Sequence, residues 1–185
     1  APNGGGSDDE YVFTDLVWED DFNTDGTPDS TKWTYDLGTT DMFGNVGWGN
    51  QEEQSYTNNE ENVIVESGSL KITAKKEGND YTSARIKTQG LYNFTYGRVE
   101  VRAKLPSAQG TWPAIWMLGS NHPTVGWPFS GEVDIMEQRG NDKTYVEGTC
   151  HWYNTAGSNN ASYGEITSIE NPSTEFHLYT VEWTE

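Results

Sequence analysis

Three carboxylates lie close together in one short, otherwise apolar segment. Glu132, Asp134 and Glu137 fall within the stretch from Gly131 to Glu137, and the nearest basic residue along the chain is Arg139. Because like charges repel, an ordinary solvated strand face intersperses Lys or Arg among its acids. Two carboxyl groups about 5–5.5 Å apart can cleave a glycosidic bond, one as the nucleophile and the other as the proton donor. A polar sheet face that carries three acids by chance is the alternative interpretation.

The spacing of these acids sets a condition on the strand that carries them. In regular pleating Glu132 and Asp134 share one face, and the apolar residues between them point to the other. Glu137 has the opposite parity and would enter the core, where a lone carboxylate is costly. An extra residue, a β-bulge near Met136, would return Glu137 to the face of Glu132. Asp134 could then hydrogen-bond and orient the nucleophile, and mutual repulsion would raise one carboxyl pKa to suit a general acid.

Tryptophans accompany the acidic segment. The stretch from Thr111 to Leu118 predicts a strand with Trp112 and Trp116 on one face, and Trp127 lies shortly before the acids. Indoles in register can form a platform on which sugar rings stack. The chain has 8 Trp, 10 Tyr and 6 Phe with 33% hydrophobic residues. This composition fits a sugar-stacking surface, but it fits equally well with aromatic residues that are present because they form strands readily. The tryptophan spacing favours a cleft.

Alternation with a period of two dominates the chain. From Gly97 to Leu105, apolar residues alternate with charged ones, as in a half-buried antiparallel strand. The other predicted strands are Asn62 to Glu66, Ser69 to Lys75, Ser83 to Thr88, Thr111 to Leu118, Gly131 to Gln138, Tyr145 to Trp152 and Phe176 to Trp183. Turn-forming residues separate them, and no segment shows a helical apolar stripe. Many short strands in 185 residues predict one all-β sandwich or barrel domain.

Composition narrows the possible partners. A formal net charge of −18 opposes binding to nucleic acid and to anionic lipid, and no apolar run has the length of a membrane span. The single cysteine, Cys150, excludes an intrachain disulfide and is expected to be a buried apolar group in a strand. The polar, Gly-rich residues 1–12 are expected to form a flexible tail before a domain at 13–185.

The acidic segment resembles the E-x-D-x-x-E signature of glycoside hydrolase family 16, and the surrounding chain resembles the laminarinase (endo-1,3-β-glucanase) branch of that family. The segments that carry the resemblance, in the family's order, are Leu16 to Phe22, Lys32 and Trp33, Gly47 to Asn50, Tyr81 to Arg85, Phe94 to Arg98, Gly110 to Leu118 and Phe176 to Trp183. The resemblance covers nearly the whole chain beyond the tail. It implies a β-jelly-roll sandwich of two antiparallel sheets with a concave, aromatic-lined substrate cleft.

The resemblance also implies a role for individual residues. By position, Glu132 matches the nucleophile, Asp134 its orienting partner and Glu137 the acid/base of a retaining enzyme that cleaves β-1,3-glucosidic bonds by double displacement. The implied sugar contacts are Asn50, Arg85, Trp112, Trp116 and His151, with Trp48, Trp127 and Gln54 as further candidates. Catalysis in this family requires no cofactor. A structural calcium ion is frequent in it, and Asp21 and the carbonyl of Gly68 match two of the ligands.

Several expectations follow from the resemblance. The partner is a laminarin-like β-glucan, and the location is outside the cell or at its surface, in a bacterium. Family domains continue past a segment like Phe176 to Trp183, so the chain is expected either to be a truncated or cleaved piece or to receive the missing C-terminal strands from another segment or chain. Two alternatives stay open: a related family 16 hydrolase acting on mixed-linkage glucan or agar, and a non-catalytic carbohydrate-binding jelly roll. The second would need the tryptophans but not Glu132 and Glu137 together.

Overall fold

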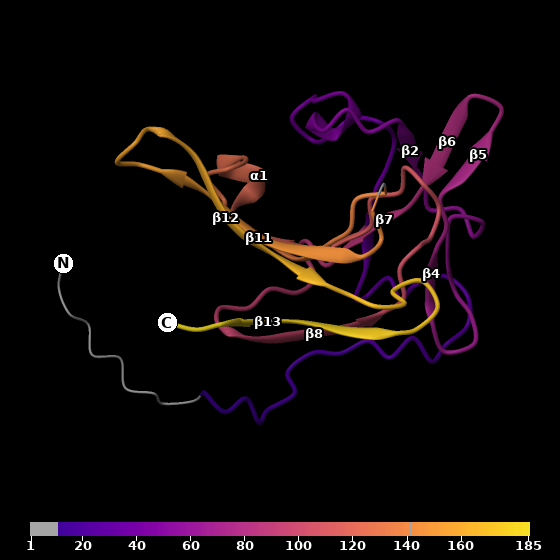
Figure 1. The fold of residues 1–185 in the computed structure, drawn as a ribbon, viewed down its shortest axis with the longest axis horizontal. Coiled ribbons are helices and arrows are strands. Elements are labelled where there is room, and N and C mark those ends of the chain that lie inside the picture. Colours follow the sequence, from indigo (N-terminus) through magenta and orange to yellow (C-terminus); the bar gives the residue numbers. More distant parts are fainter. Residues whose placement is uncertain (1–10, 141) are drawn as a thin grey trace.

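The computed structural model describes residues 11–140 and 142–185, and this part of the chain is almost entirely β-structure (Figure 1). The strands are β1 (Thr34–Asp36), β2 (Gln54–Tyr56), β3 (Val63–Val65), β4 (Leu70–Ile72), β5 (Lys75–Glu77), β6 (Asp80–Ser83), β7 (Arg85–Lys87), β8 (Gly97–Ala103), β9 (Ala114–Leu118), β10 (Glu132–Glu137), β11 (Tyr145–Asn154), β12 (Asn159–Ser168) and β13 (His177–Trp183). The helical turns are Gly47–Gly49 and α1 (His122–Val125). Among the described residues, no helix has the length and apolar character needed to cross a membrane.

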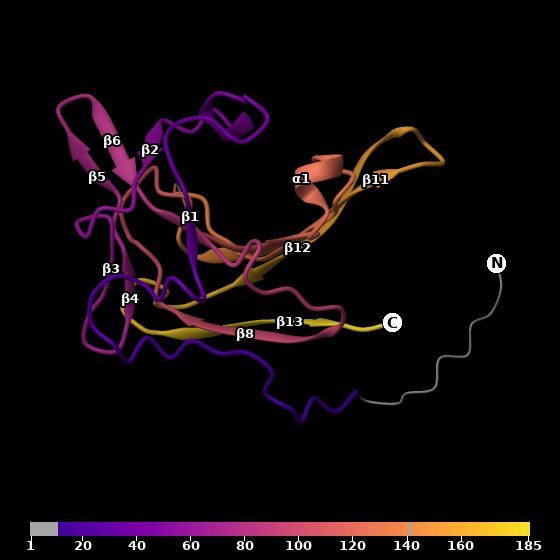
Figure 2. The ribbon, with the colours of Figure 1, turned by 180° about the vertical axis from the view of Figure 1, so that it is seen from behind.

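Two antiparallel layers enclose the core. One is the sheet β12-β11-β10-β9, in which β10 carries the acidic segment, and the other is the ribbon of β8 and β13. The ribbon runs beneath the first sheet in both views (Figures 1 and 2). Leu105, Met136 and Tyr179 are buried between the layers, with partly buried apolar side chains packed around them. This core fixes the inner face of β10, so its outer face is free to carry polar groups.

Small sheets gather at one end of the molecule, where the first half of the chain folds (Figures 1 and 2). They are β2-β6-β5, β1-β7 and β3-β4. The segment after β1 joins β2 through a bridge between Gly38 and Tyr56. This end supplies the candidate site residues that precede the tryptophan and acidic segments in the sequence.

The all-β sandwich is confirmed, and the described strands show where the sequence prediction failed. Alternation in β8 is confirmed, although the strand ends at Ala103 and Leu105 enters the core with its N–H donated to the carbonyl of Pro172 at 2.8 Å. The single strand predicted from Ser69 to Lys75 is wrong. It divides into β4 and β5 because Asn62 hydrogen-bonds both the N–H and the carbonyl of the intervening Thr73, at 2.8 and 2.9 Å.

Two further expectations concern the rest of the chain. The predicted burial of Cys150 is wrong: the residue lies in β11 as predicted, but its side chain is exposed. The predicted tail, residues 1–12, falls outside the described residues except for Tyr11 and Val12, which are exposed and outside any strand. The tail and domain boundaries therefore stay predictions.

Candidate active site

Strand β10 contains the bulge that the spacing of its acids requires. Toward β9, Asp134 and Met136 pair with consecutive residues, which leaves Ile135 without a partner. Toward β11, the three steps from Asp134 to Glu137 correspond to two steps on the partner strand. Ile135 and Met136 both pack on the core, so Glu137 emerges on the side of Asp134. The bulge is confirmed, with the unpaired residue one position before the predicted Met136.

Burial raises the pKa of two carboxyl groups on this strand. Asp134 is 5% exposed, and burial, followed by the charges of Glu132 and Glu137, raises its pKa to about 8. Burial is also the largest cause of the raised pKa of Glu132, opposed by hydrogen bonds from Asp134 and Trp127. The hydrogen bond between the two groups raises the pKa of Asp134 and lowers that of Glu132. The proton therefore resides on Asp134, which donates a hydrogen bond to the carboxylate of Glu132. The raised pKa values thus belong to Glu132 and Asp134. Their largest cause is burial, rather than the repulsion between carboxylates that was predicted.

His151 adds a basic group to the same pair. It lies opposite Glu132 in the register of β10 and β11, and its Nε2 lies 3.1 Å from Oδ2 of Asp134. Its ring centroid is 6.1 Å from that of Trp127, the tryptophan that also hydrogen-bonds Glu132. The structure therefore places His151 and Trp127, two of the sugar contacts implied by the resemblance, next to the acids.

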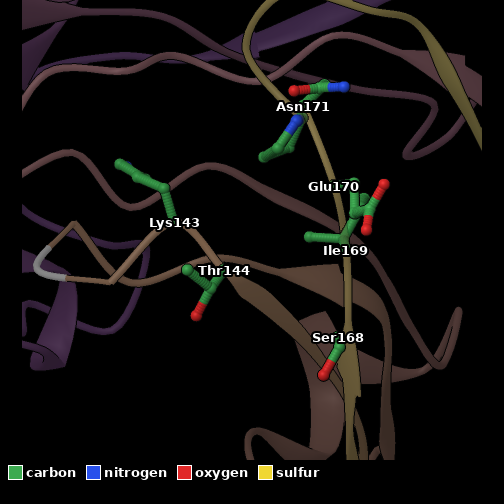
Figure 3. A pocket seen from close by; sticks show the side chains of 7 residues that line it. Lys143, Thr144, Ser168, Ile169, Glu170 and Asn171 are labelled. Atoms are coloured by element: carbon green, nitrogen blue, oxygen red, sulfur yellow. The ribbon is translucent and has the colours of Figure 1, made fainter.

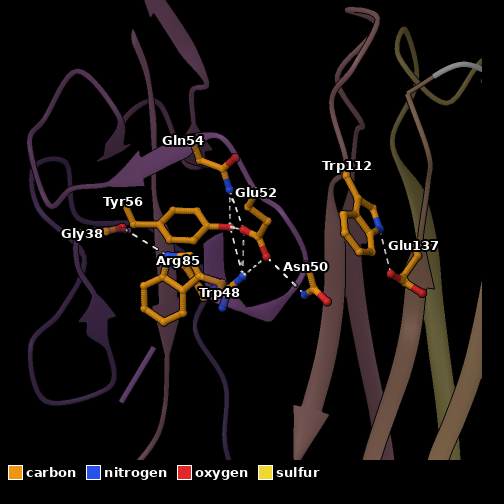
Figure 4. Close-up of polar contacts among 9 residues, drawn as sticks. All are labelled: Gly38, Trp48, Asn50, Glu52, Gln54, Tyr56, Arg85, Trp112 and Glu137. Carbon is orange, nitrogen blue, oxygen red and sulfur yellow. Dashed lines mark hydrogen bonds and ion pairs between the residues drawn. The ribbon is translucent and has the colours of Figure 1, made fainter. Parts of the chain in front are cut away.

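A tryptophan holds the second glutamate. The indole Nε1 of Trp112 donates to Oε1 of Glu137 at 2.7 Å, as Figure 4 shows. The guanidinium carbon of Arg139 lies 4.5 Å from the centroid of the same indole. The prediction that Trp112 and Trp116 extend from one strand is wrong, because β9 begins at Ala114 and Trp112 precedes it. Trp112 is 40% exposed, whereas Trp116 is half-buried in β9.

The other candidate site residues form a second polar cluster around a carboxylate that was not predicted (Figure 4). Its members are Trp48, Asn50, Glu52, Gln54, Tyr56 and Arg85. Nη2 of Arg85 donates to both carboxylate oxygens of Glu52, at 2.9 and 3.2 Å. The guanidinium carbon of Arg85 lies 5.4 Å from the ring centroid of Trp116. Since Trp116 pairs with Asp134 across β9 and β10, the second cluster adjoins the acids.

Sequence reasoning missed Glu52 and Tyr56, and a local signal for them exists. Glu52, Gln54 and Tyr56 alternate with Glu53 and Ser55, so the three share one side of an extended segment. Gln54 donates to Glu52 at 2.6 Å and to Tyr56 at 2.8 Å. The predicted sugar contact Gln54 is therefore engaged with these two neighbours.

The predicted calcium ligands lie in segments that the structure brings together. The N–H of Ser67 donates to Oδ1 of Asp25 at 3.0 Å, which joins the loop of Asp21 to the turn containing Gly68. The carboxylate of Asp21 accepts hydrogen bonds from the backbone and side chain of Asn23. Among the described residues, the one group of three His, Cys, Asp or Glu side chains close enough to share a metal ion lies on β10 and β11. Asp21 is therefore contacted by nitrogen donors of Asn23 and, in the described part of the chain, belongs to no such group.

A shallow depression of about 480 Å³ lies apart from both clusters (Figure 3). It is lined by Lys143, Thr144 and residues 168–172, next to the ends of β11 and β12. None of the candidate site residues contributes to it, so it does not belong to the site.

Known proteins resemble this chain in sequence and in structure. Residues 50–185 match the model of Glycosyl hydrolases family 16. A β-glucanase from Rhodothermus marinus is 44% identical over 188 residues, which cover 98% of this chain and 63% of that protein. A laminarinase structure from a Flavobacterium species superposes with a TM-score of 0.81 at 46% identity and covers 92% of this chain and 71% of that one. LamA from Zobellia galactanivorans, solved with laminaritriose and laminaritetraose, gives a TM-score of 0.81 at 40% identity, covering 94% and 75%.

Proposed function

The chain belongs to glycosyl hydrolases family 16, and from this premise we propose that it is a retaining, endo-acting hydrolase of β-1,3-glucosidic bonds in laminarin-type glucans. The observation that carries the proposal is the bulge in β10, which directs Glu137 to the side that holds Glu132 and Asp134. The laminarinase name of one relative, and the laminaritriose and laminaritetraose bound in another, support a laminarin-type substrate.

In the first step, Glu132 attacks the anomeric carbon and Glu137 protonates the departing glycosidic oxygen. Asp134 retains its proton at neutral pH because its pKa is raised to about 8, so it donates a hydrogen bond to Glu132 and fixes the attacking oxygen. Oε1 of Glu137 already accepts the indole N–H of Trp112, and a protonated Oε1 could not keep that bond at full strength. The transferable proton therefore resides on Oε2 of Glu137.

In the second step, water attacks the glucosyl ester of Glu132 from the face that the leaving group has vacated. Glu137, now a carboxylate, removes a proton from this water, which returns it to its acid form. Two inversions give net retention of the β configuration. No metal or cofactor takes part in either step.

The sugar chain would lie along the line from the second cluster to the acids. Arg85 and Asn50 provide hydrogen-bond donors, Trp116 lies between them and β10, and His151 and Trp127 line the far side of Glu132. We assign all of these residues to substrate binding, in agreement with the sequence prediction.

The test is the release of reducing ends from laminarin by wild type and by Glu132→Ser, with product configuration followed by NMR. We expect β-anomeric products from wild type, loss of at least about a thousandfold in the variant, and retained laminarin binding by the variant. Glu100→Gln on the β8 ribbon is the matched control, because its carboxylate is exposed and pairs with Arg98 rather than with any residue of the candidate site. Unchanged activity in Glu132→Ser, or α-anomeric first products, would contradict the mechanism.

The same assay separates the alternative functions. Faster cleavage of lichenan or agarose than of laminarin would favour a related family 16 specificity. Laminarin binding by wild type without any release of reducing ends would favour a carbohydrate-binding jelly roll.

We further propose a structural calcium ion held by Asp21 and the Gly68 carbonyl, on the support that Asp25 and Ser67 join the two segments. Calcium would then raise the melting temperature of wild type, chelation would lower it, and Asp21→Ala would show neither change. We also propose that the protein acts outside the cell or at its surface, where a polymeric glucan is accessible. Detection of the protein by antibody in the extracellular fraction of its source organism tests this location.

A further inference from the structure

Glu52 accepts hydrogen bonds from four other residues of the second cluster. Its side chain is 8% exposed and accepts hydrogen bonds from Arg85, from Gln54 at 2.6 Å, from Asn50 at 3.4 Å and from the hydroxyl of Tyr56. Burial raises the pKa of Tyr56 to about 12, so this hydroxyl keeps its proton at neutral pH and can donate it. A carboxylate removed from water to this extent requires such donors. Glu52 thus contacts three residues that were predicted to bind sugar.

One nitrogen of the guanidinium, Nη2, makes all the hydrogen bonds that Arg85 forms with the described part of the chain. Nη2 is used internally, by both oxygens of Glu52 and by the hydroxyl of Tyr56 at 3.1 Å. Within residues 11–140 and 142–185, Nε and Nη1 make no hydrogen bond to protein. The guanidinium carbon lies 4.6 Å from the ring centroids of both Trp48 and Tyr56, which restricts its movement. Nε and Nη1 of Arg85 therefore form a fixed set of donors that have no acceptor among the described residues.

These donors lie next to the reacting groups. Arg85 is 5.4 Å from the ring of Trp116, and Trp116 is paired with Asp134 on the acidic strand. The positive charge of Arg85 also acts at Glu132, where it lowers the carboxyl pKa against the larger effect of burial. A sugar bound to Glu132 would be within the field of this guanidinium.

We propose that Glu52 is a positioning residue that holds Arg85, and with it Asn50, in the orientation that binds the glucan beside Glu132. Glu52 has its oxygens occupied by protein donors and makes no contact with sugar itself. This inference rests on the proposed function, since it assigns the orientation of two substrate-binding residues of that site.

An ion pair with a purely structural role is the competing explanation, and the neighbouring strands provide a matched control. Lys87 and Asp36 form an ion pair on β1 and β7, and Asp36 is paired in register with Arg85 itself. Asp36→Asn therefore removes a partly buried carboxylate from a basic partner in the same small sheet without touching Glu52. A structural role predicts similar effects of Asp36→Asn and Glu52→Gln.

The experiment measures KM and kcat on laminarin, together with melting temperature, for Glu52→Gln, Glu52→Asp, Tyr56→Phe and Asp36→Asn. Glu52→Gln replaces an acceptor oxygen by an amide that faces Arg85, and we expect KM to rise about tenfold while kcat falls less than about threefold. Glu52→Asp should recover part of the loss, and Tyr56→Phe should raise KM about threefold because one acceptor of Nη2 is removed. Asp36→Asn should leave both constants unchanged.

A double variant tests whether Glu52 acts through Arg85. Adding Glu52→Gln to Arg85→Met should raise KM no further than Arg85→Met alone, whereas multiplied effects would overturn the proposal. Unchanged KM in folded Glu52→Gln would also overturn it, and if that variant does not fold, the KM of Tyr56→Phe decides. Failure of wild type to release reducing ends from laminarin would contradict the proposed function, whereas an active wild type with unaffected variants would contradict only the positioning role.

Discussion

Nε1 of Trp112 lies 2.7 Å from Oε1 of Glu137 and donates a hydrogen bond to it. This contact comes from outside β9 and β10, and it fixes the rotation of the carboxyl group that is proposed to deliver the proton. An aromatic residue that was expected to act as a stacking surface thus also orients the acid.

Replacing Trp112 by Phe should therefore impair proton delivery more than binding. The variant keeps an aromatic ring but loses the N–H, and we expect kcat on laminarin to fall by about tenfold or more. An aryl β-glucoside with a highly acidic phenol leaving group needs little protonation, so the variant should lose much less activity on it. Equal losses on both substrates would show that the hydrogen bond does not serve the acid.

The raised pKa of Asp134 predicts a pH-dependent stability. A carboxyl with an ordinary pKa of 3.8 that reaches about 8 in the folded chain binds its proton more tightly when folded. Its stabilising contribution is complete below the unfolded pKa and is lost as the pH rises through the folded pKa. Thermal unfolding of wild type and Asp134→Asn should show the variant gaining relative stability between about pH 5 and about pH 8. A constant difference over this range would refute the assignment.

Gly119 closes the loop that carries Trp127, and it has no room for a side chain. A Cβ built on Gly119 would lie 2.2 Å from the carbonyl oxygen of Ser130, so Gly119→Ala must move backbone. We expect a loss of about 1–3 kcal/mol in the free energy of unfolding, measured by denaturant titration. Gly148→Ala is the control, since its Cβ would meet the carbonyl of Asp134 at an ordinary 3.6 Å. Equal stability of the two variants would contradict the packing of this loop.

Asn62 is predicted to be the most sensitive polar residue of the first half of the chain. It is fully buried, accepts from Thr57 at 2.6 Å and donates to the carbonyl of Thr73 and the hydroxyl of Thr82. Asn62→Ala should cost about 2–4 kcal/mol of unfolding free energy because it leaves buried partners unpaired. The nearby exposed Asn59 provides a control, and Asn59→Ala should cost less than about 1 kcal/mol. Similar melting temperatures for both variants would count against this network.

The acidic segment was predictable in detail because its parity left few solutions. Glu132 and Glu137 have opposite parity, and burying either carboxylate alone is costly, so the sequence required an irregularity between them. The position of the unpaired residue was missed by one, since Ile135 and Met136 are both apolar and both pack on the core. Side-chain type could not distinguish them.

Other parts were not predictable from local pattern. Strand β12 pairs with β11 over ten residues, yet all of its residues except Ala161 are exposed, so no alternation of apolar and polar residues marks it. Glu52 is one of 29 acidic residues, and although its alternation places it on one side of the segment with Gln54 and Tyr56, this pattern does not indicate an arginine 33 positions away. Its role follows only from tertiary contacts. The place of Trp112 before β9 likewise depends on where pairing begins rather than on residue type.

The unpaired Ile135 also changes how chains of this kind should be compared. Glu137 lies five residues after Glu132, yet the two side chains point to the same face as if they were four residues apart. The reason is that the bulge takes Ile135 out of the regular alternation of the strand. A chain shortened by that single residue, with an ordinary pleat, would present the same carboxylates to the same side. Two such sequences differ in the number of residues between the glutamates although they place the carboxylates equivalently. An alignment based on the face to which each residue points would match the glutamates, whereas one based on residue spacing would not.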